Sequence, residues 1–173
     1  MRRRVLDERG LTLAEILVAV AIIGIGLAGL AVVIPVSSFG VQEGAQLSTA
    51  TFLAEQRIEQ VRNAVWTASP DSDCIGLSAG DTAPAIPAGK MCTTTGSGAG
   101  TTTFGDEANV PGYPNYSRQT RVIDCMANAA QCSGIGDDAL RLVTVTVWYR
   151  PLTGGGVATQ NKPVTIQWLV SQK

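Results

Sequence analysis

An unbroken apolar run near the N-terminus limits what this chain can fold into. Ile16 through Phe39 are 24 consecutive residues without a charged side chain, and the next charge is Glu43. A helix of that length rises about 36 Å, which is enough to cross a hydrocarbon core of about 30 Å with some tilt. The run therefore predicts a membrane-spanning helix. The stretch before it is basic and should stay cytoplasmic, which places the residues beyond about 40 outside; its arginines are Arg2, Arg3, Arg4 and Arg9.

A secretory signal peptide also begins with a basic stretch and an apolar run. This run is too long for a signal-peptide apolar region of about 7–15 residues, and no Ala-x-Ala-like cleavage site closes it. Glu15 places a carboxylate at the leading edge of the run. An ionised group at the bilayer centre costs on the order of 2.5–3.5 kcal/mol, and less nearer the interface, so we expect a cationic partner and a functional role. The alternative is a carboxylate that snorkels to the headgroup level.

The segment that contains this carboxylate reads Gly10-Leu11-Thr12-Leu13-Ala14-Glu15-Ile16-Leu17-Val18-Ala19-Val20. It resembles the cleavage and assembly motif of type IV prepilins and of type II secretion pseudopilins. The resemblance implies that a membrane peptidase cuts after Gly10 and methylates the new terminal amine of Leu11, and that Glu15 is the fifth mature residue. The family usually has phenylalanine at the first mature position, where this chain has Leu11.

The physics of a charge in the membrane agrees with that family role. The Glu15 carboxylate of one subunit could pair with the free amine of Leu11 on a neighbour. Two unit charges about 4 Å apart attract by about 4 kcal/mol at an effective dielectric of 20, before desolvation is subtracted. The pair would chiefly fix how far one subunit is shifted along its neighbour, because a subunit docked one helical turn off leaves both charges unpaired. Cleavage is required first, since it creates the amine.

The helix is expected to continue beyond the membrane span. Pro35 lacks a backbone N–H and should kink or locally open it. Further along, the pattern becomes amphipathic, so one helix of about 80 Å is predicted from about Thr12 to Ala64, with Ser69-Pro70 as its stop. The apolar stripe of this second half comprises Leu47, Ala50, Ala54, Ile58, Val61 and Val65.

Four cysteines follow the predicted span: Cys74, Cys92, Cys125 and Cys132. An even count beyond a membrane anchor predicts two disulfides in an oxidising compartment. Of the three possible pairings, Cys74–Cys92 and Cys125–Cys132 close their loops at the lowest entropic cost. Reduced thiols packed as small apolar groups are an alternative. A four-thiolate metal site is less expected, because structural sites usually carry closely spaced cysteine pairs.

The remainder of the chain predicts a small head of α+β class. Residues 71–115 are rich in Gly, Ser, Thr, Pro and Ala, which predicts loops with one short strand. Residues 118–125 predict a first strand, and the alternation over Leu140–Tyr149 and Pro163–Val170 predicts two more, joined by a hairpin across 151–161. A three- or four-stranded antiparallel sheet packed on the amphipathic half-helix follows. The last two strands resemble the C-terminal hairpin of PilV-like minor pilins.

Each of these last two strands should have one apolar face. The predicted face holds Val143, Val145, Val147 and Tyr149 on the first strand, and Val164, Ile166, Trp168 and Val170 on the second. The whole chain then divides into a cleaved basic leader (1–10), a transmembrane and assembly helix (11–40), the amphipathic half of the same helix (41–66) and a periplasmic head (67–173).

Composition argues against several other classes of function. The chain has no histidine, which removes the commonest general base and metal ligand, and we expect no catalytic residues, no metal and no cofactor. A net charge of −1 argues against nucleic acid as the main partner. Asp71 with Asp73, and Asp137 with Asp138, do not supply enough ligands to predict a calcium site, so solvated loop acids are favoured.

The sequence therefore predicts a structural minor pilin that joins or primes a type IV pilus. Its expected partners are other pilin subunits, the prepilin peptidase and the inner-membrane assembly machinery. A pseudopilin of the type II secretion system is the alternative within the family. A membrane-anchored periplasmic binding module or enzyme is the alternative from another class.

Overall fold

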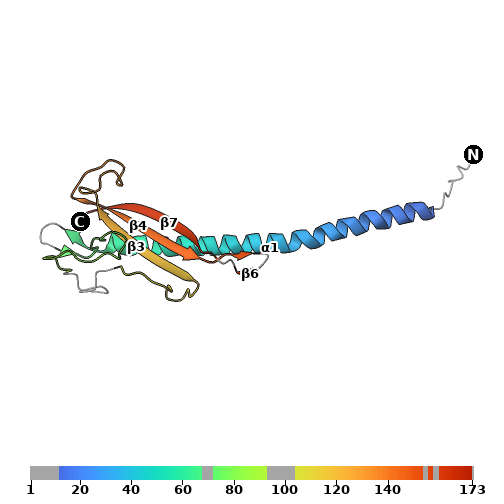
Figure 1. Ribbon diagram of the computed structural model, residues 1–173, viewed down its shortest axis with the longest axis horizontal. Helices are drawn as coiled ribbons and strands as arrows, with labels where there is room; N and C mark the ends of the chain where they lie inside the picture. The colour runs from blue at the N-terminus through green and yellow to red at the C-terminus, as the bar shows by residue number, and fades with distance from the viewer. Residues whose placement is uncertain (1–11, 68–71, 93–103, 154–155, 158–159, 173) are drawn as a thin grey trace, which may run out of the picture. The chain divides into compact units, whose positions relative to one another are not determined.

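The computed structural model describes residues 12–67, 72–92, 104–153, 156–157 and 160–172. It contains one long helix and small antiparallel sheets (Figure 1), the α+β, pilin-like architecture that the sequence predicts. The chain divides into two compact units, Met1–Val41 and Gln42–Lys173.

Helix α1 spans Leu13–Asn63, which confirms the prediction of one continuous helix from about Thr12 to Ala64. The predicted stop at Ser69-Pro70 was wrong, because the helix ends earlier. Beyond it the chain enters strand β1 (Trp66–Thr67), which pairs with β2 (Ser72–Asp73). Burial of the Trp66 side chain explains the early end, since the indole lies in the core with 5% of its surface exposed.

Pro35 lies inside α1, and the helix is assigned without a break across it. Two hydroxyls just beyond the proline bond back to the preceding turn. Ser37 Oγ donates to the carbonyl of Val33 at 2.9 Å, and Ser38 Oγ donates to that of Ile34 at 3.0 Å. Such hydroxyls offer the backbone additional bonds near a residue that cannot donate one. The expected kink stays a prediction.

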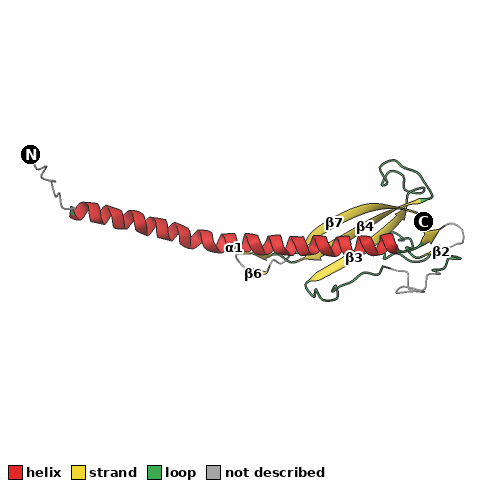
Figure 2. Cartoon of the chain, turned by 180° about the vertical axis from the view of Figure 1, so that it is seen from behind, coloured by secondary structure: helices red, strands yellow, loops and turns green. Residues whose placement is uncertain are grey.

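The main sheet has three antiparallel strands in the order β3-β4-β7. They are β3 (Tyr116–Asp124), β4 (Leu140–Tyr149) and β7 (Lys162–Ser171). The connection from β4 to β7 contains a short hairpin of β5 (Leu152–Thr153) and β6 (Gly156–Val157). These elements confirm the three strands and the hairpin that the alternation predicts. Figure 2 shows β4 between β3 and β7.

The predicted apolar face of β4 is confirmed, because Val143, Val145, Val147 and Tyr149 all lie in the main core. On β7, Val170 is buried in the same core, and Val164 and Ile166 pack against it. Trp168 pairs with Val143 and so shares that face, but it lies at its rim with 47% of its surface exposed. There the guanidinium of Arg62 sits over the indole, 5.3 Å from the ring centre.

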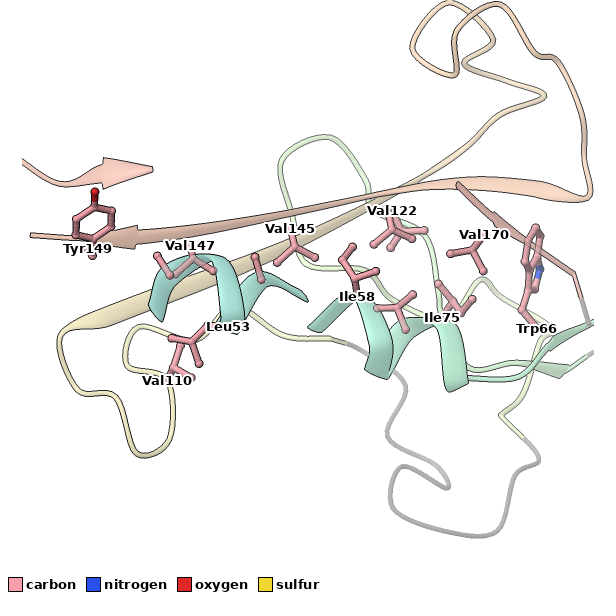
Figure 3. Packing of buried hydrophobic residues seen from close by; sticks show 14 residues of the cluster. Leu53, Ile58, Trp66, Ile75, Val110, Val122, Val145, Val147, Tyr149 and Val170 are labelled. Atoms are coloured by element: carbon pink, nitrogen blue, oxygen red, sulfur yellow. The ribbon is translucent and has the colours of Figure 1, made fainter. Parts of the chain in front are cut away.

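Within the second unit, one face of α1 packs on this sheet (Figure 3). Ile58 points from the helix toward Val122 and Val145 of the sheet. The buried helix positions are Ala50, Leu53, Ala54, Arg57, Ile58 and Val61. The predicted stripe was wrong at Leu47, which is 46% exposed and lies before the buried stretch begins. The stripe also omitted Leu53, which is fully buried beside Ala54.

Loops also pack against the buried part of the helix, and Ile75 and Val110 from these loops lie in the main core. The structure joins Cys74 to Cys92, with Cα atoms 4.7 Å apart, and Cys125 to Cys132, with Cα atoms 5.6 Å apart. This is the pairing that the lowest loop-closure cost predicts. The second bond belongs to a small separate cluster at one end of the sheet, formed by Cys125, Cys132 and Leu142, with Ile123 and Leu140 packed against it.

Candidate assembly site at the N-terminal helix

The first unit presents an apolar helix whose side chains have no cover within that unit. The most hydrophobic 18-residue stretch of α1 has a mean hydropathy of 2.9, and none of it is buried. Leu13, Ile25 and Val41, for example, are 74–76% exposed. Apolar surface left in water costs about 25 cal/mol per Å², so a helix of this kind requires lipid or other helices around it. The helix is long and apolar enough to cross a membrane.

The first turn of α1 is closed by a reciprocal pair of side chains, Thr12 and Glu15. The backbone N–H of Thr12 donates to Glu15 Oε2 at 2.8 Å, and the Thr12 hydroxyl donates to the same oxygen at 3.0 Å. In return, the backbone N–H of Glu15 donates to Thr12 Oγ1 at 3.2 Å. This is a capping box, which satisfies two of the N–H groups that a helix start leaves without partners.

Glu15 therefore has a local role that the sequence analysis missed. The signal was present as Thr12-x-x-Glu15 directly before an apolar run, which is the sequence pattern of a capping box. The negative charge also suits the helix start, where the macrodipole is positive. The Glu15 side chain nevertheless stays exposed. A cation from another chain can thus reach the carboxylate without displacing any packed group.

The two residues of the proposed cleavage site, Gly10 and Leu11, lie outside the described residues. The structure places Glu15 against Thr12 and places Pro35 further along the same helix. The four cysteines belong to the second unit, where they tie loops and have no part in the N-terminal segment.

Two of the loop acids considered for calcium have structural roles instead. Asp73 is fully buried, and its Oδ1 accepts from Arg141 at 2.8 Å and from the backbone N–H groups of Ile75 and Gly76 at 3.0 and 2.8 Å. Asp137 accepts from the N–H of Ala139 at 2.8 Å in a turn. Among the described residues, no group of three or more His, Cys, Asp or Glu is placed to hold a metal ion.

Arg141 completes the surroundings of Asp73. Its guanidinium lies over the Trp66 ring, 4.1 Å from the ring centre, so that one cation serves both the aromatic face and the carboxylate. Burial by itself raises the pKa of Asp73, but the hydrogen bonds from Arg141, Gly76 and Ile75 hold the resulting pKa below its ordinary value. Arg141 thus ties β1, through Trp66, and β2, through Asp73, to β4 of the main sheet.

A second ionic group sits inside the helix–sheet contact. Glu107 binds two arginines, Arg57 of α1 at 2.6 Å and Arg118 of β3 at 2.7 Å. Arg118 also donates to the carbonyl of Leu53 at 2.8 Å and to the Gln56 amide oxygen at 3.2 Å. These contacts fix one register of the helix on the sheet, since a buried arginine without its partner is costly. Sequence reasoning assigned no role to these charges.

The comparisons with known proteins agree with the N-terminal motif. A family model described as the prokaryotic N-terminal methylation motif matches residues 6–31. The searches of curated proteins and of solved structures returned no match. The matched segment contains Glu15 with its capping box and the first half of the apolar helix. The match over residues 6–31 supports a type IV prepilin-like protein.

Proposed function

We propose that this protein is a minor pilin, which a prepilin peptidase processes and which then joins or primes a type IV pilus. The observation that carries the proposal is the exposed apolar helix headed by Glu15 inside the methylation motif. Before assembly the helix anchors the protein in the inner membrane with its head in the periplasm. Two disulfides in the head suit that oxidising compartment.

In this proposal, assembly of the subunits depends on one pair of opposite charges. Cleavage after Gly10 frees the amine of Leu11, and the exposed Glu15 carboxylate of a neighbouring subunit is its counter-charge. The apolar surface that lipid covers before assembly is covered by neighbouring helices in the filament core. A subunit docked one turn off would leave an amine and a carboxylate unpaired in apolar surroundings, so the pair selects one register.

Mass spectrometry of the mature N-terminus tests the processing step. We expect the mature chain to begin at Leu11 with a methyl group on its amine. A chain that still begins at Met1 would contradict the proposal and would favour a membrane-anchored periplasmic module. As a matched control, Gly10→Val should leave a full-length precursor in the membrane, because a side chain next to the cut obstructs the peptidase.

A pseudopilin of the type II secretion system shares the motif and the helix, and is the second candidate. The fraction in which the protein is recovered distinguishes a pilin from a pseudopilin. A pilin should appear in filaments sheared from the cell surface, whereas a pseudopilin should stay with the secretion machinery.

A further inference from the structure

The two edges of the main sheet differ in how their backbone groups are bonded. On the outer edge of β3, the N–H of Glu107 donates to the carbonyl of Arg118 at 2.8 Å, and the N–H of Arg118 donates back at 2.9 Å. The N–H of Val110 donates to the carbonyl of Tyr116 at 2.9 Å. The loop that contains Glu107 and Val110 therefore covers the start of this edge.

The remainder of the β3 edge is covered in the same way. The N–H of Ser78 donates to the carbonyl of Val122 at 2.8 Å, and the N–H of Val122 donates to Ser78 Oγ at 3.0 Å. Between these contacts, the Arg121 guanidinium donates to the carbonyl of Thr120 at 2.8 Å. A further strand would have to displace all of these bonds, so the β3 edge is closed.

The β7 edge is open. In an antiparallel ladder, the N–H and C=O of one residue point to the same side, and the side alternates along the strand. Just past the strand, the N–H of Gln172 donates to the carbonyl of Ala139 at 3.0 Å, so the even-numbered residues of β7 face β4. The odd-numbered residues present their backbone N–H and C=O groups outward. In the described part of the chain, no hydrogen bond is made to these outward backbone groups. These residues are Thr165, Gln167, Leu169 and Ser171.

The usual protection of an exposed edge is also missing from most of β7. Natural edge strands are blunted by charged side chains, proline, bulges or short length. Strand β7 has ten residues in unbroken register with β4. Lys162 is its one charged residue, and it is paired with Glu43 of α1. Pro163 lacks an N–H at the first outward position only. The longer part of β7 after it remains free to pair with another strand.

Two hollows flank this open edge, one on each face of the sheet. The hollow on the helix side has a volume of about 340 Å³ and includes Glu59 and Arg62 in its lining. The hollow on the other side has a volume of about 390 Å³ and includes Cys132 and Leu142. Side chains of an extended strand point alternately to the two faces, so a strand along β7 would place one side chain in each hollow.

We propose that the β7 edge binds an extended segment of another pilin-type subunit, which continues the sheet by β-augmentation. The segment would direct a polar side chain toward Glu59 and Arg62 and an apolar one toward Cys132 and Leu142. The inference rests on the proposed function, since it takes a subunit of the same filament as the partner.

A second copy of this chain does not fit as that partner. The sheet cannot continue from β7 onto β3 of another copy, because the β3 edge is closed. Pairing β7 with β7 about a two-fold axis would turn one head end for end relative to the other. Subunits anchored in one membrane, or assembled in one filament, point the same way. The strand donor is therefore a different subunit.

Amide hydrogen exchange on the full-length chain tests the proposal without requiring the identity of the donor. In detergent, the amides of Thr165, Gln167, Leu169 and Ser171 should exchange fast, and those of Val164, Ile166 and Trp168 slowly. In sheared filaments, the first set should slow by about tenfold or more, because their N–H groups are then bonded. Unchanged exchange would overturn the inference alone. Absence of the wild-type chain from filaments would overturn the proposed function, and the inference with it.

A matched pair of variants tests the same edge by recovery in filaments. Gln167→Pro removes an outward N–H and leaves the backbone bonds to β4 in place, whereas Gln167→Ala keeps that N–H. Both variants lose the hydrogen bond from the Gln167 side chain to the Thr144 hydroxyl, so the two are matched in that respect. We expect recovery to fall by about tenfold or more for the proline variant and by less than about twofold for the alanine variant. Equal recovery would overturn the proposal. If the proline variant fails to fold, the exchange experiment on the wild-type chain decides. Thr165→Cys chains that crosslink to each other would overturn it in favour of self-pairing.

Discussion

The Glu15 carboxylate has a partner within its own chain before any neighbour arrives. In the structure it accepts from the backbone and the hydroxyl of Thr12, and so closes the first turn of α1. In a filament the proposed partner is the amine of Leu11 on another subunit. A carboxylate has two oxygens and about four acceptor sites, so it can keep the cap and bind the amine together. The two roles make different predictions for substitution.

Glu15→Gln is the variant that separates them. A glutamine side chain also serves in a capping box, so the helix start should persist, but the negative charge is lost. We expect recovery in sheared filaments to fall by about tenfold or more, since the amine of a neighbour then lacks its counter-charge. Membrane insertion and cleavage after Gly10 should continue, and mass spectrometry of the membrane fraction checks both.

Thr12→Ala is the control for this prediction. It removes the capping hydroxyl at a cost of about 1 kcal/mol to the helix start and leaves the charge of Glu15 intact. Its recovery in filaments should stay near the wild-type value. If Thr12→Ala loses recovery as strongly as Glu15→Gln does, the cap and not the charge pair controls assembly.

Asp73 is the other residue whose environment predicts a measurable effect. Its pKa is held below the ordinary value, so its ionised form stabilises the fold above the unfolded-state pKa of about 3.9, and this stability is lost as the pH falls through the folded-state pKa. Asp73→Asn should destabilise the head by roughly 3–5 kcal/mol at neutral pH, because Arg141 is left buried without its counter-charge.

Urea unfolding between pH 2 and pH 7 checks this prediction, with Asp138→Asn as the exposed control. The wild-type chain and the control should lose stability together below about pH 4, whereas the Asp73→Asn chain should show a flatter dependence. A parallel dependence in all three chains would show that the buried pair is not the source of the acid sensitivity.

The buried face of helix α1 includes two small side chains, and added volume at these positions should be poorly tolerated. Ala50 and Ala54 are fully buried, so their methyl groups are enclosed by neighbouring side chains. Ala54→Leu should destabilise the head by about 1–3 kcal/mol through overpacking. Ala45→Leu makes the same change at an exposed position of the same helix and should alter stability by less than about 0.5 kcal/mol. Thermal or denaturant unfolding compares the two, and equal effects would mean that helix propensity rather than packing is responsible.

The elements with regular periodicity could be predicted from the sequence, and the contacts between them could not. The uncharged run from Ile16 gave the apolar half of α1, and the alternation in β4 and β7 gave both strands with their apolar faces. Leu47 and Leu53 show the limit, because both fit a helical stripe and only the position of the sheet decides which is buried.

The charged contacts were beyond sequence reasoning for a different reason. Arg57 and Glu107 lie far apart in the chain, with the end of α1, β1 and β2 between them, and Asp73 and Arg141 are 68 residues apart. Pairing over such distances in the chain leaves no local pattern. The capping box at Thr12 and Glu15 was different, since its spacing was visible in the sequence and only its meaning was overlooked.

At the scale of the whole molecule, the second unit contains all of the main core. Every buried member of that core lies between Ala50 and Val170, and both disulfides belong to the same unit. A chain of residues 42–173 should therefore fold without the apolar half of the helix. We expect a monomer with helical and β circular dichroism and a thermal midpoint within about 4–8 °C of the full-length chain in detergent, equivalent to about 1 kcal/mol.

Size-exclusion chromatography and non-reducing peptide mapping check that expectation. The maps should show the Cys74–Cys92 and Cys125–Cys132 links and no free thiol. A fragment that aggregates, or that forms mixed disulfides, would show that the first unit is needed for the head to fold.

The ionic contact between α1 and the sheet also has a mechanical consequence. In the proposed filament, tension would pull each head along the axis of its own helix. A slip of one helical turn would move the Leu53 carbonyl by about 5.4 Å, out of reach of Arg118, and would separate Arg57 from Glu107 in the same step. The two arginines would resist such a slip, because each would lose its bond across the contact between the helix and the head.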